Sequence, residues 1–252
     1  MEVLNKLSTT DKVVIDVETS GLDWKRNYIV GYVFTFSPNP ADSYYIPVRH
    51  RANNLYDFYP PEDAETTQTL KLHPFEMDVH SIFKERSIHL IGHNLAFDLK
   101  FLHKHQIDIS KCTFEDTMIN AGLINEYRSS YSLENCCIDA GVQPKKGSEL
   151  YQYLKGKFGG PDTSKQMSNF WRLSGNDEMG VDYAEGDGTS TYQLWEKQQK
   201  DLDQQDLRQV WHLENQVIRV LHRMVTRGVN IDEDRLDKVA NQTTQKLEEA
   251  KN

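Results

Sequence analysis

Hydrophobic runs alternate with segments of helical spacing through the first half of the chain. Four runs rich in β-branched and aromatic residues, bounded by polar or turn-forming residues, predict strands. They cover residues 13–17, 28–36, 43–48 and 87–92. Apolar residues at helical spacing predict helices over 75–85 and 94–105. This alternation indicates an α/β fold whose sheet is at least partly parallel.

The second half of the chain has mainly helical spacing. Helices are predicted over 113–127, where acids lie near the start, over 131–141, and over 179–200. Two segments rich in polar residues, glycine or proline predict surface loops, and we expect the second of them to be mobile. These segments are 50–73 and 155–169.

Past residue 201 the pattern changes to two long helices. The first has an apolar stripe and ends at Gly228, and the second begins with Asp232 as a helix N-cap. The stripe consists of Leu213, Val217, Val220, Leu221, Met224 and Val225. Because the second helix has few apolar positions, we expect its packing partner to lie beyond residue 252 or on another chain.

Composition limits the class of protein. The 252 residues have 38% hydrophobic content, enough for a sizeable core, and a net charge of −9, which argues against a protein that coats nucleic acid. No apolar run reaches the length of a membrane span, and the N-terminus lacks a signal-peptide pattern. The three cysteines lack zinc-site spacing, so we expect reduced thiols and a cytoplasmic location without membrane contact.

Two acids at the end of the first predicted strand require an explanation. In KVVIDVETSGLD, Asp16 and Glu18 are two positions apart and therefore point to the same face of the strand. Like charges placed side by side repel each other. Taken alone, the pair is equally compatible with a polar strand end.

Further acids lie on inward helix faces. In GHNLAFDLKFL, Asp98 lies on the apolar stripe, with Asn94 one turn earlier, and in DYAEGDGTSTYQL, Tyr183 and Asp187 also share a face. Taken alone, Asp98 fits a solvated helix position and Tyr183 a core aromatic. Gly186 and Gly188 inside this last helical pattern indicate close approach by a backbone, metal or ligand.

The four acids together favour a metal site. Carboxylate oxygens suit hard cations such as Mg²⁺ or Mn²⁺, and two such ions about 4 Å apart activate water for phosphodiester hydrolysis. Two divalent cations would also neutralise the repulsion among Asp16, Glu18, Asp98 and Asp187. Without metal, at least one of these carboxyl groups is expected to have a raised pKa.

Three motifs resemble a known family. DVET, HNLAFD and YAEGD, in this order, resemble the exonuclease motifs of the tyrosine-bearing branch of the DEDD superfamily. The likeness extends over residues 12–236 to the proofreading domain of family A, DNA polymerase I-like, enzymes, including phage or viral ones. It implies a ribonuclease H-like (DnaQ-like) fold, with a mixed central sheet flanked by helices and a C-terminal helical extension. Residues 1–200 would be the 3′-5′ exonuclease domain, and 201–252 a helical linker resembling the start of a polymerase thumb.

The resemblance also implies roles for the site residues. Asp16, Glu18 and Asp187 would hold the catalytic cation, and Asp98 with Asp16 a second one. Tyr183 would hydrogen-bond the attacking water. Two further residues, Leu22 and Asn94, would contact the substrate, Leu22 as a wedge against the terminal bases and Asn94 near the scissile sugar-phosphate. A turn-packing role for Leu22 stays open. Asp116 matches another family position, but a helix N-cap explains it.

The expected activity is removal of nucleotides from single-stranded or frayed DNA 3′ ends, releasing 5′-monophosphates. Its partners would be that DNA end and a polymerase domain or subunit absent from this chain, because no polymerase pattern follows residue 228. An RNA-trimming enzyme similar to ribonuclease D is the first alternative. A scaffold without catalysis is the second, although all four acids and the tyrosine are present.

Overall fold

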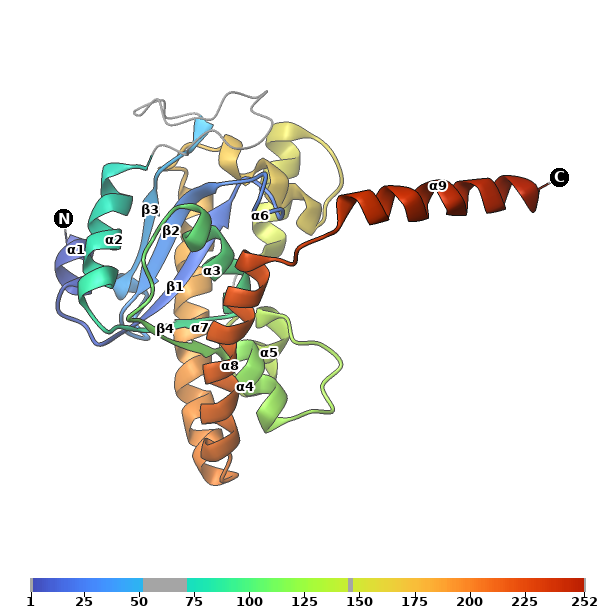
Figure 1. Cartoon of the computed structure of the whole chain (residues 1–252). Helices are drawn as coiled ribbons and strands as arrows, with labels where there is room; N and C mark the ends of the chain where they lie inside the picture. Colours follow the sequence, from blue (N-terminus) through green and yellow to red (C-terminus); the bar gives the residue numbers. More distant parts are fainter. Residues whose placement is uncertain (1, 52–71, 145–146, 252) are drawn as a thin grey trace.

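A five-stranded mixed sheet forms the centre of the computed structural model, which describes residues 2–51, 72–144 and 147–251 (Figure 1). The strands are β1 (Lys12–Thr19), β2 (Ile29–Thr35), β3 (Ser43–Pro47), β4 (His89–Gly92) and β5 (Thr113–Asp116). Their order across the sheet is β3-β2-β1-β4-β5. The hairpins β1–β2 and β2–β3 are antiparallel, whereas β4 and β5 run parallel to β1. The predicted mixed sheet is therefore confirmed.

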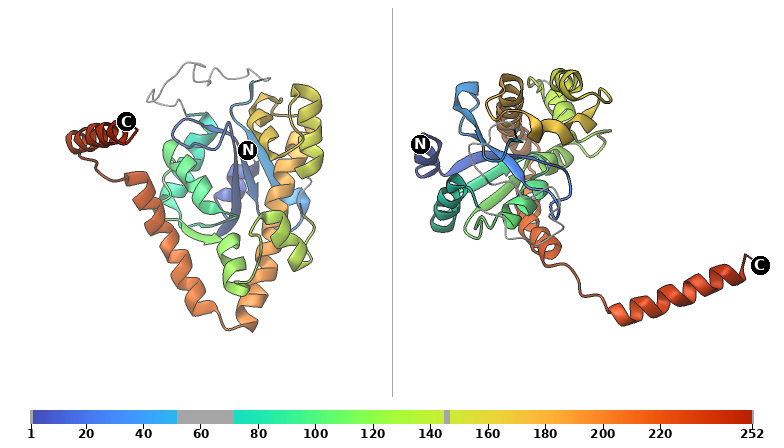
Figure 2. Two further views of the ribbon diagram at one scale, coloured as in Figure 1. Left: turned by 90° about the vertical axis from the view of Figure 1, so that its right-hand side faces the viewer. Right: turned by 90° about the horizontal axis from the view of Figure 1, so that it is seen from above.

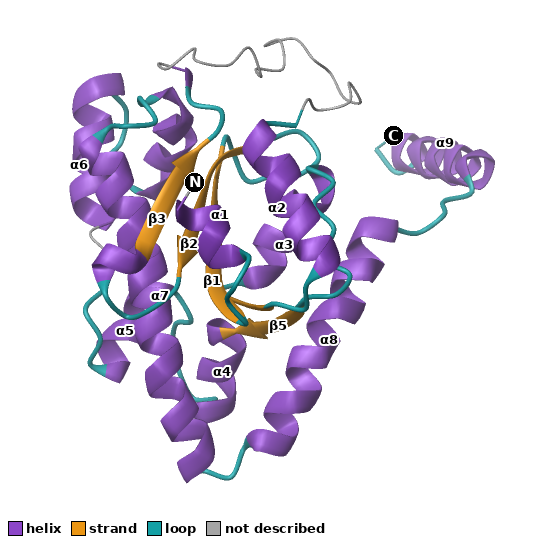
Figure 3. Cartoon of the chain, turned by 90° about the vertical axis from the view of Figure 1, so that its left-hand side faces the viewer, coloured by secondary structure: helices purple, strands orange, loops and turns teal. Residues whose placement is uncertain are grey.

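Helices cover both faces of the sheet (Figure 3). On one face lie α1, α2 and α3, and on the other α6 and the long helix α7. The helices up to this point are α1 (Glu2–Leu7), α2 (Pro74–Glu85), α3 (Leu95–Lys104), α4 (Thr117–Ile124), α5 (Leu133–Ala140), α6 (Gly147–Phe158) and α7 (Glu178–Gln204). Two short 3₁₀ helices, η1 (Pro40–Asp42) and η3 (Ser164–Arg172), complete this part of the chain.

The central strand β1 divides its side chains between these two layers. Val13, Ile15 and Val17 are buried in the cluster that includes α2 and α3. Val14 packs instead with Tyr192 of α7. Because side chains alternate along a strand, the next residues of even number on β1 also face the α7 layer.

Most predicted elements are present, and two predictions are wrong. Residues 113–116 are not the start of a helix but the edge strand β5, which pairs with β4 before α4 begins. Its four residues are too few for a strand pattern to be seen, and Phe114 is the only apolar residue among them. The 155–169 segment is not one loop, because its first residues end α6 and its last lie in η3. Residues 52–71 of the predicted 50–73 loop lie outside the described part of the chain.

Helix α8 (Arg208–Arg227) lies along this body, and α9 (Glu233–Glu249) extends away from it (Figure 2). α8 is attached through the buried residues Asn215 and Ile218, and the Trp211 indole donates to the Glu115 carboxylate at 3.0 Å. α9 buries none of its residues, and Asp232 caps it as predicted. Among the described residues, no helix has the length and apolar content needed to cross a membrane.

The apolar stripe predicted on α8 faces away from the body. Its outer residues are all at least half exposed, namely Leu213, Val220, Leu221, Met224 and Val225. Gly228 ends the helix as expected. The sequence thus correctly placed the helix but not the face that packs, since a polar residue, Asn215, lies at the buried contact.

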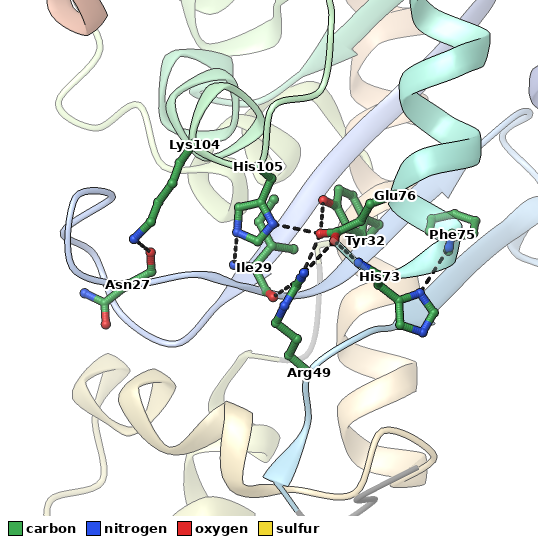
Figure 4. Close-up of polar contacts among 9 residues, drawn as sticks. All are labelled: Asn27, Ile29, Tyr32, Arg49, His73, Phe75, Glu76, Lys104 and His105. Atoms are coloured by element: carbon green, nitrogen blue, oxygen red, sulfur yellow. Dashed lines mark hydrogen bonds and ion pairs between the residues drawn. The ribbon is translucent and has the colours of Figure 1, made fainter. Parts of the chain in front are cut away.

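A buried ionic network joins α2 to strand β2, to the chain after β3 and to the end of α3 (Figure 4). Glu76 of α2 accepts from the Arg49 guanidinium (Nη1 to Oε1, 2.7 Å), the Tyr32 hydroxyl (2.8 Å) and the His73 backbone N–H (2.7 Å). His105 accepts from the Ile29 N–H at Nε2, so its Nδ1 donates to Glu76 at 2.7 Å. Burial alone would raise the pKa of Glu76, but the hydrogen bonds and charges of Arg49 and His105 hold it well below its usual range.

Candidate active site

The two acids of β1 point toward α7. On the neighbouring strand, Asp16 lies opposite Val33 and Glu18 opposite Gly31, and the register shifts after Glu18. Such irregularities often re-aim side chains beside active sites. Asp16 is half-buried and Glu18 is buried. The predicted shared face of the two acids is therefore present in the fold.

Helix α7 brings Asp187 to these acids. One carboxylate oxygen from each of Asp16, Glu18 and Asp187 lies within 4.8 Å of the others. Gly188 explains how α7 comes so near, because a Cβ there would lie 2.2 Å from the Thr35 hydroxyl. Gly186 faces open space instead. The close neighbours of Gly188 are side chains of β2 and β3 rather than a backbone, and approach of a metal or ligand to either glycine stays a prediction.

Asp98 is buried next to the cluster. Its carboxylate accepts from the Val17 backbone N–H at 3.0 Å, between the two acids of β1. The pairing of β1 with β4 ends at Val14, so α3 occupies this edge of β1 beyond the end of β4. Burial, and then the charge of Asp16, raise the pKa of the Asp98 carboxyl well above its usual range. This confirms the expected raised pKa for one acid of the group.

Two tyrosines adjoin the acids. Tyr183 is buried one turn before Asp187 on α7, and its ring lies 6.3 Å from that of Phe170. Tyr45 reaches across Gly31, the position opposite Glu18, and its hydroxyl lies 2.5 Å from His50. Burial raises the pKa of Tyr45 well above its usual range, and the charges of Glu18 and then Asp16 raise it further. Sequence reasoning missed Tyr45, because only the strand pairing places it beside the acids.

The two residues expected to contact substrate lie at the surface. Leu22 is 84% exposed, in the turn that follows β1. Asn94 is exposed at the start of α3 and has a left-handed backbone (φ 61°). The exposure of Leu22 does not fit a turn-packing role, since a packed leucine would be covered. Both side chains are accessible to a ligand.

Asp116 has more contacts than a helix cap requires. Its carboxylate accepts from Met118 N–H at the start of α4, as predicted, and also from the N–H groups of Asn94 and Leu95. The sequence could not show these last two bonds, because they depend on the pairing of β4 with β5.

The donor set fits a divalent metal ion. Three carboxylates, one half-buried and two buried, offer oxygen ligands, and oxygen is the ligand that Mg²⁺ and Mn²⁺ prefer. A cation would also stabilise the ionised form of Asp98, whose pKa is raised by burial and by Asp16. The cysteines take no part, since Cys112, Cys136 and Cys137 form no disulfide and are buried in other clusters of the fold.

Comparison with solved structures establishes the fold class. Brucella melitensis NrnC superposes with a TM-score of 0.60 at 18% identity, over 88% of this chain and 87% of that chain. Structures of NrnC bound to pGG and with bound Mg²⁺ also match. At this identity the similarity shows a shared fold, which is the DnaQ-like, ribonuclease H-like exonuclease fold.

Comparison of sequences establishes the family. The DNA polymerase DpoZ of Salmonella phage PMBT28 is 32% identical over 93% of this chain, and that of Acinetobacter phage SH-Ab 15497 is 28% identical over 94%. The chain spans about a third of the length of these curated relatives. A family model described as 3′-5′ exonuclease matches residues 1–203. The chain therefore belongs to the 3′-5′ exonuclease family of the family A DNA polymerases.

Proposed function

We propose that the chain is a metal-dependent exonuclease that shortens single-stranded or frayed DNA from the 3′ end and releases nucleoside 5′-monophosphates. The observation that carries this proposal is the cluster of Asp16, Glu18 and Asp187, whose oxygens lie within 4.8 Å of one another. The preference for DNA is supported by the phage DNA polymerases among the relatives.

Two divalent cations, Mg²⁺ or Mn²⁺, are the proposed cofactors. Bound at this site, such ions acidify the attacking water and stabilise charge on the leaving oxygen. Asp16, Glu18 and Asp187 would hold one ion, and Asp98 with Asp16 the other. The buried setting of Asp98 and Glu18 strengthens their electrostatic interaction with a cation, because the local dielectric is low.

The other residues would orient the water and the DNA end. The Tyr183 hydroxyl would hydrogen-bond the attacking water and orient it. The exposed Leu22 would pack against the terminal base. Asn94, exposed at the start of α3, would contact the sugar-phosphate near the bond that is cleaved.

Matched DNA and RNA oligomers of one sequence, labelled at the 5′ end and incubated with Mn²⁺, test the proposal. We expect a ladder of products shortened from the 3′ end, with DNA consumed faster than RNA. The Asp16→Ala/Glu18→Ala variant should leave both oligomers intact. If it degraded DNA at the wild-type rate, the assigned site would be wrong. If wild-type protein bound DNA but never cleaved it, a scaffold role would replace catalysis.

An RNA-trimming enzyme is the second candidate function. It is favoured by the near-complete overlap with NrnC, in which 87% of that chain is covered and no polymerase part is needed for the match. Faster shortening of the RNA oligomer than of its DNA counterpart would reverse the order of the two candidates.

We also propose that residues 201–252 connect the nuclease to a polymerase domain or subunit. The relatives are DNA polymerases about three times as long as this chain. The outward apolar residues of α8 and the fully exposed helix α9 offer surface for such a partner. Size-exclusion chromatography with a candidate polymerase subunit tests this, and co-elution that is lost in Leu221→Asp/Met224→Asp is the expected result.

A further inference from the structure

We propose that Asp116 is a positioning residue of the nuclease site, which holds the start of α3 so that Asn94 and Asp98 keep their places. This inference rests on the proposed function for the meaning of those two residues. Its hydrogen bonds reach the site through the first residues of α3.

The contacts of Asp116 join the starts of two helices. Its carboxyl group is buried, with 2% of the residue exposed. Oδ1 accepts from the N–H groups of Asn94 and Met118, each at 2.9 Å, and Oδ2 accepts from the N–H of Leu95 at 2.8 Å. The first N–H groups of a helix have no partner within the helix, and a carboxylate is a strong acceptor for them.

Helix α3 depends on this outside acceptor. The residue at its N-cap position, Asn94, makes no side-chain capping bond and has a left-handed backbone. A residue other than glycine adopts that conformation at an energetic cost, which the surrounding structure must offset. Asp116 bonds the N–H of Asn94 itself and of Leu95 next to it. It therefore stabilises the very turn from which the Asn94 side chain projects.

The same turn sets the position of Asp98. Asp98 lies within the first turn of α3 and accepts from the Val17 N–H of β1. The start of α3 is thus held at two points, by Val17 inside the site and by Asp116 outside it. Loss of the Asp116 bonds would leave the site residues unchanged in chemistry but free to shift, and misplacement by about 1 Å is enough to reduce a rate by roughly 10²-fold.

Asp116 is in turn held by α8. Its backbone N–H donates to Asn215 Oδ1 at 3.2 Å, and the Asn215 amide donates to the Trp211 carbonyl at 2.9 Å. Asn215 is buried, although it lies on a helix that is largely exposed. The start of α3 is therefore connected, through Asp116, to the helix that leads out of the nuclease body.

Asp116→Asn is the variant that tests the proposal. The amide has the same shape but only one oxygen, so in either orientation its NH₂ group faces a backbone N–H at the start of α3 or α4. We expect kcat on a single-stranded DNA oligomer to fall about 10²-fold, with KM within about threefold. Binding of Mn²⁺, measured by electron paramagnetic resonance without DNA, should weaken, because Asp98 is displaced.

Ser132→Ala is the matched control. Ser132 caps α5 through Asn135 N–H, as Asp116 caps α4, but it makes no bond to α3. It should therefore lose thermal stability while keeping wild-type kcat and Mn²⁺ binding. A folded Asp116→Asn protein with kcat and Mn²⁺ binding within twofold of wild type would overturn the proposal and leave Asp116 as a helix cap.

Two further outcomes are also decisive. If Asp116→Asn does not fold, Asn215→Ala takes its place, and a folded Asn215→Ala protein must show lowered kcat for the proposal to stand. If wild-type protein lacks nuclease activity, the proposed function fails. Mn²⁺ binding of wild type and Asp116→Asn then decides the positioning role by itself, with equal binding counting against it.

Discussion

Two buried acids of this chain have pKa values shifted in opposite directions. Glu76 and Asp98 are both almost fully buried, on helices that cover the same face of the sheet. The pKa of Glu76 is lowered, because Arg49 and His105 bond its carboxylate. The pKa of Asp98 is raised, mainly by burial and to a smaller extent by repulsion from the charge of Asp16. The difference lies in the neighbours and not in the depth of burial.

This contrast distinguishes a buried charge that the protein itself balances from one that a bound cation would balance. At Glu76 the chain supplies the counter-charge, so the network is complete in the protein alone (Figure 4). At Asp98 the next charged groups that shift its pKa are further acids, Asp16 and Asp116. A site built in this way is stabilised when a cation binds, which is how the proposed function accounts for four acids near one strand.

The largest expected effect is on the nuclease rate, which should depend on Asp98 far more than on Glu76. Asp98→Asn should reduce the nuclease rate at least about 10³-fold, because cation contacts contribute several kcal/mol to the transition state. In the absence of metal its free energy of unfolding should not fall, since the amide keeps the bond from Val17 and removes the repulsion with Asp16. Kinetics and urea unfolding check both. A stability loss equal to that of Glu76→Gln would remove the contrast.

The next effect concerns stability at Glu76. Arg49→Met should lower the free energy of unfolding by about 3–5 kcal/mol, because it leaves a buried carboxylate without its cation. The Arg49→Met/Glu76→Gln double variant should be more stable than Arg49→Met alone, since the unmatched charge is gone. Denaturant titration measures each step of this cycle. Strict additivity of the two changes would show that the pair is not coupled.

Two glycines of α7 extend the comparison to the helix that carries Asp187. Gly188→Ala should destabilise the protein by about 1–3 kcal/mol through overpacking against Thr35 and Val33, and should slow the nuclease by shifting Asp187. Gly186→Ala should instead stabilise it by up to about 1 kcal/mol, because its Cβ meets nothing and alanine favours a helix. Melting temperatures distinguish the two signs, and equal shifts would contradict the packing seen at Gly188.

The last expected effect is a pH dependence of stability, which develops gradually between about pH 6.5 and pH 4. Burial lowers the pKa of His50 and of His105 to about 4, whereas an unfolded histidine titrates near 6.5. Protons then bind the unfolded chain first, so this stability is complete above about pH 6.5 and declines toward pH 4, by roughly 1.4 kcal/mol per pH unit for each histidine. His50→Gln should reduce the slope. An unchanged slope would exclude His50 as a source.

The sequence predicted the inward position of Asp98 but not the network around Glu76. Asp98 could be placed on an inward face because helical spacing (i, i+3) relates it to Phe101. The Glu76 network could not be predicted, because apolar periodicity carries no information about which distant cation a buried acid will meet. Arg49 and His105 come from either side of α2 in the chain and meet Glu76 only after folding.

The same limit applies to the candidate site. Local motifs identified the four acids and Tyr183 as candidates. The fold brings one carboxylate oxygen from each of three of these acids to within 4.8 Å of the others, close enough to share a cation. The strand β5 was missed because it is short and ends in two acids. Without β5, the bonds from Asp116 to the start of α3 could not be foreseen, although its role as the N-cap of α4 could.

The network around Glu76 also joins two points that are far apart in the chain. Arg49 and the backbone N–H of His73 bond the same carboxylate, so one side chain joins two points on either side of residues 52–71. Glu76 therefore connects the chain just after β3 to the start of α2. We expect loss of the Glu76 carboxylate to release both of these points at once.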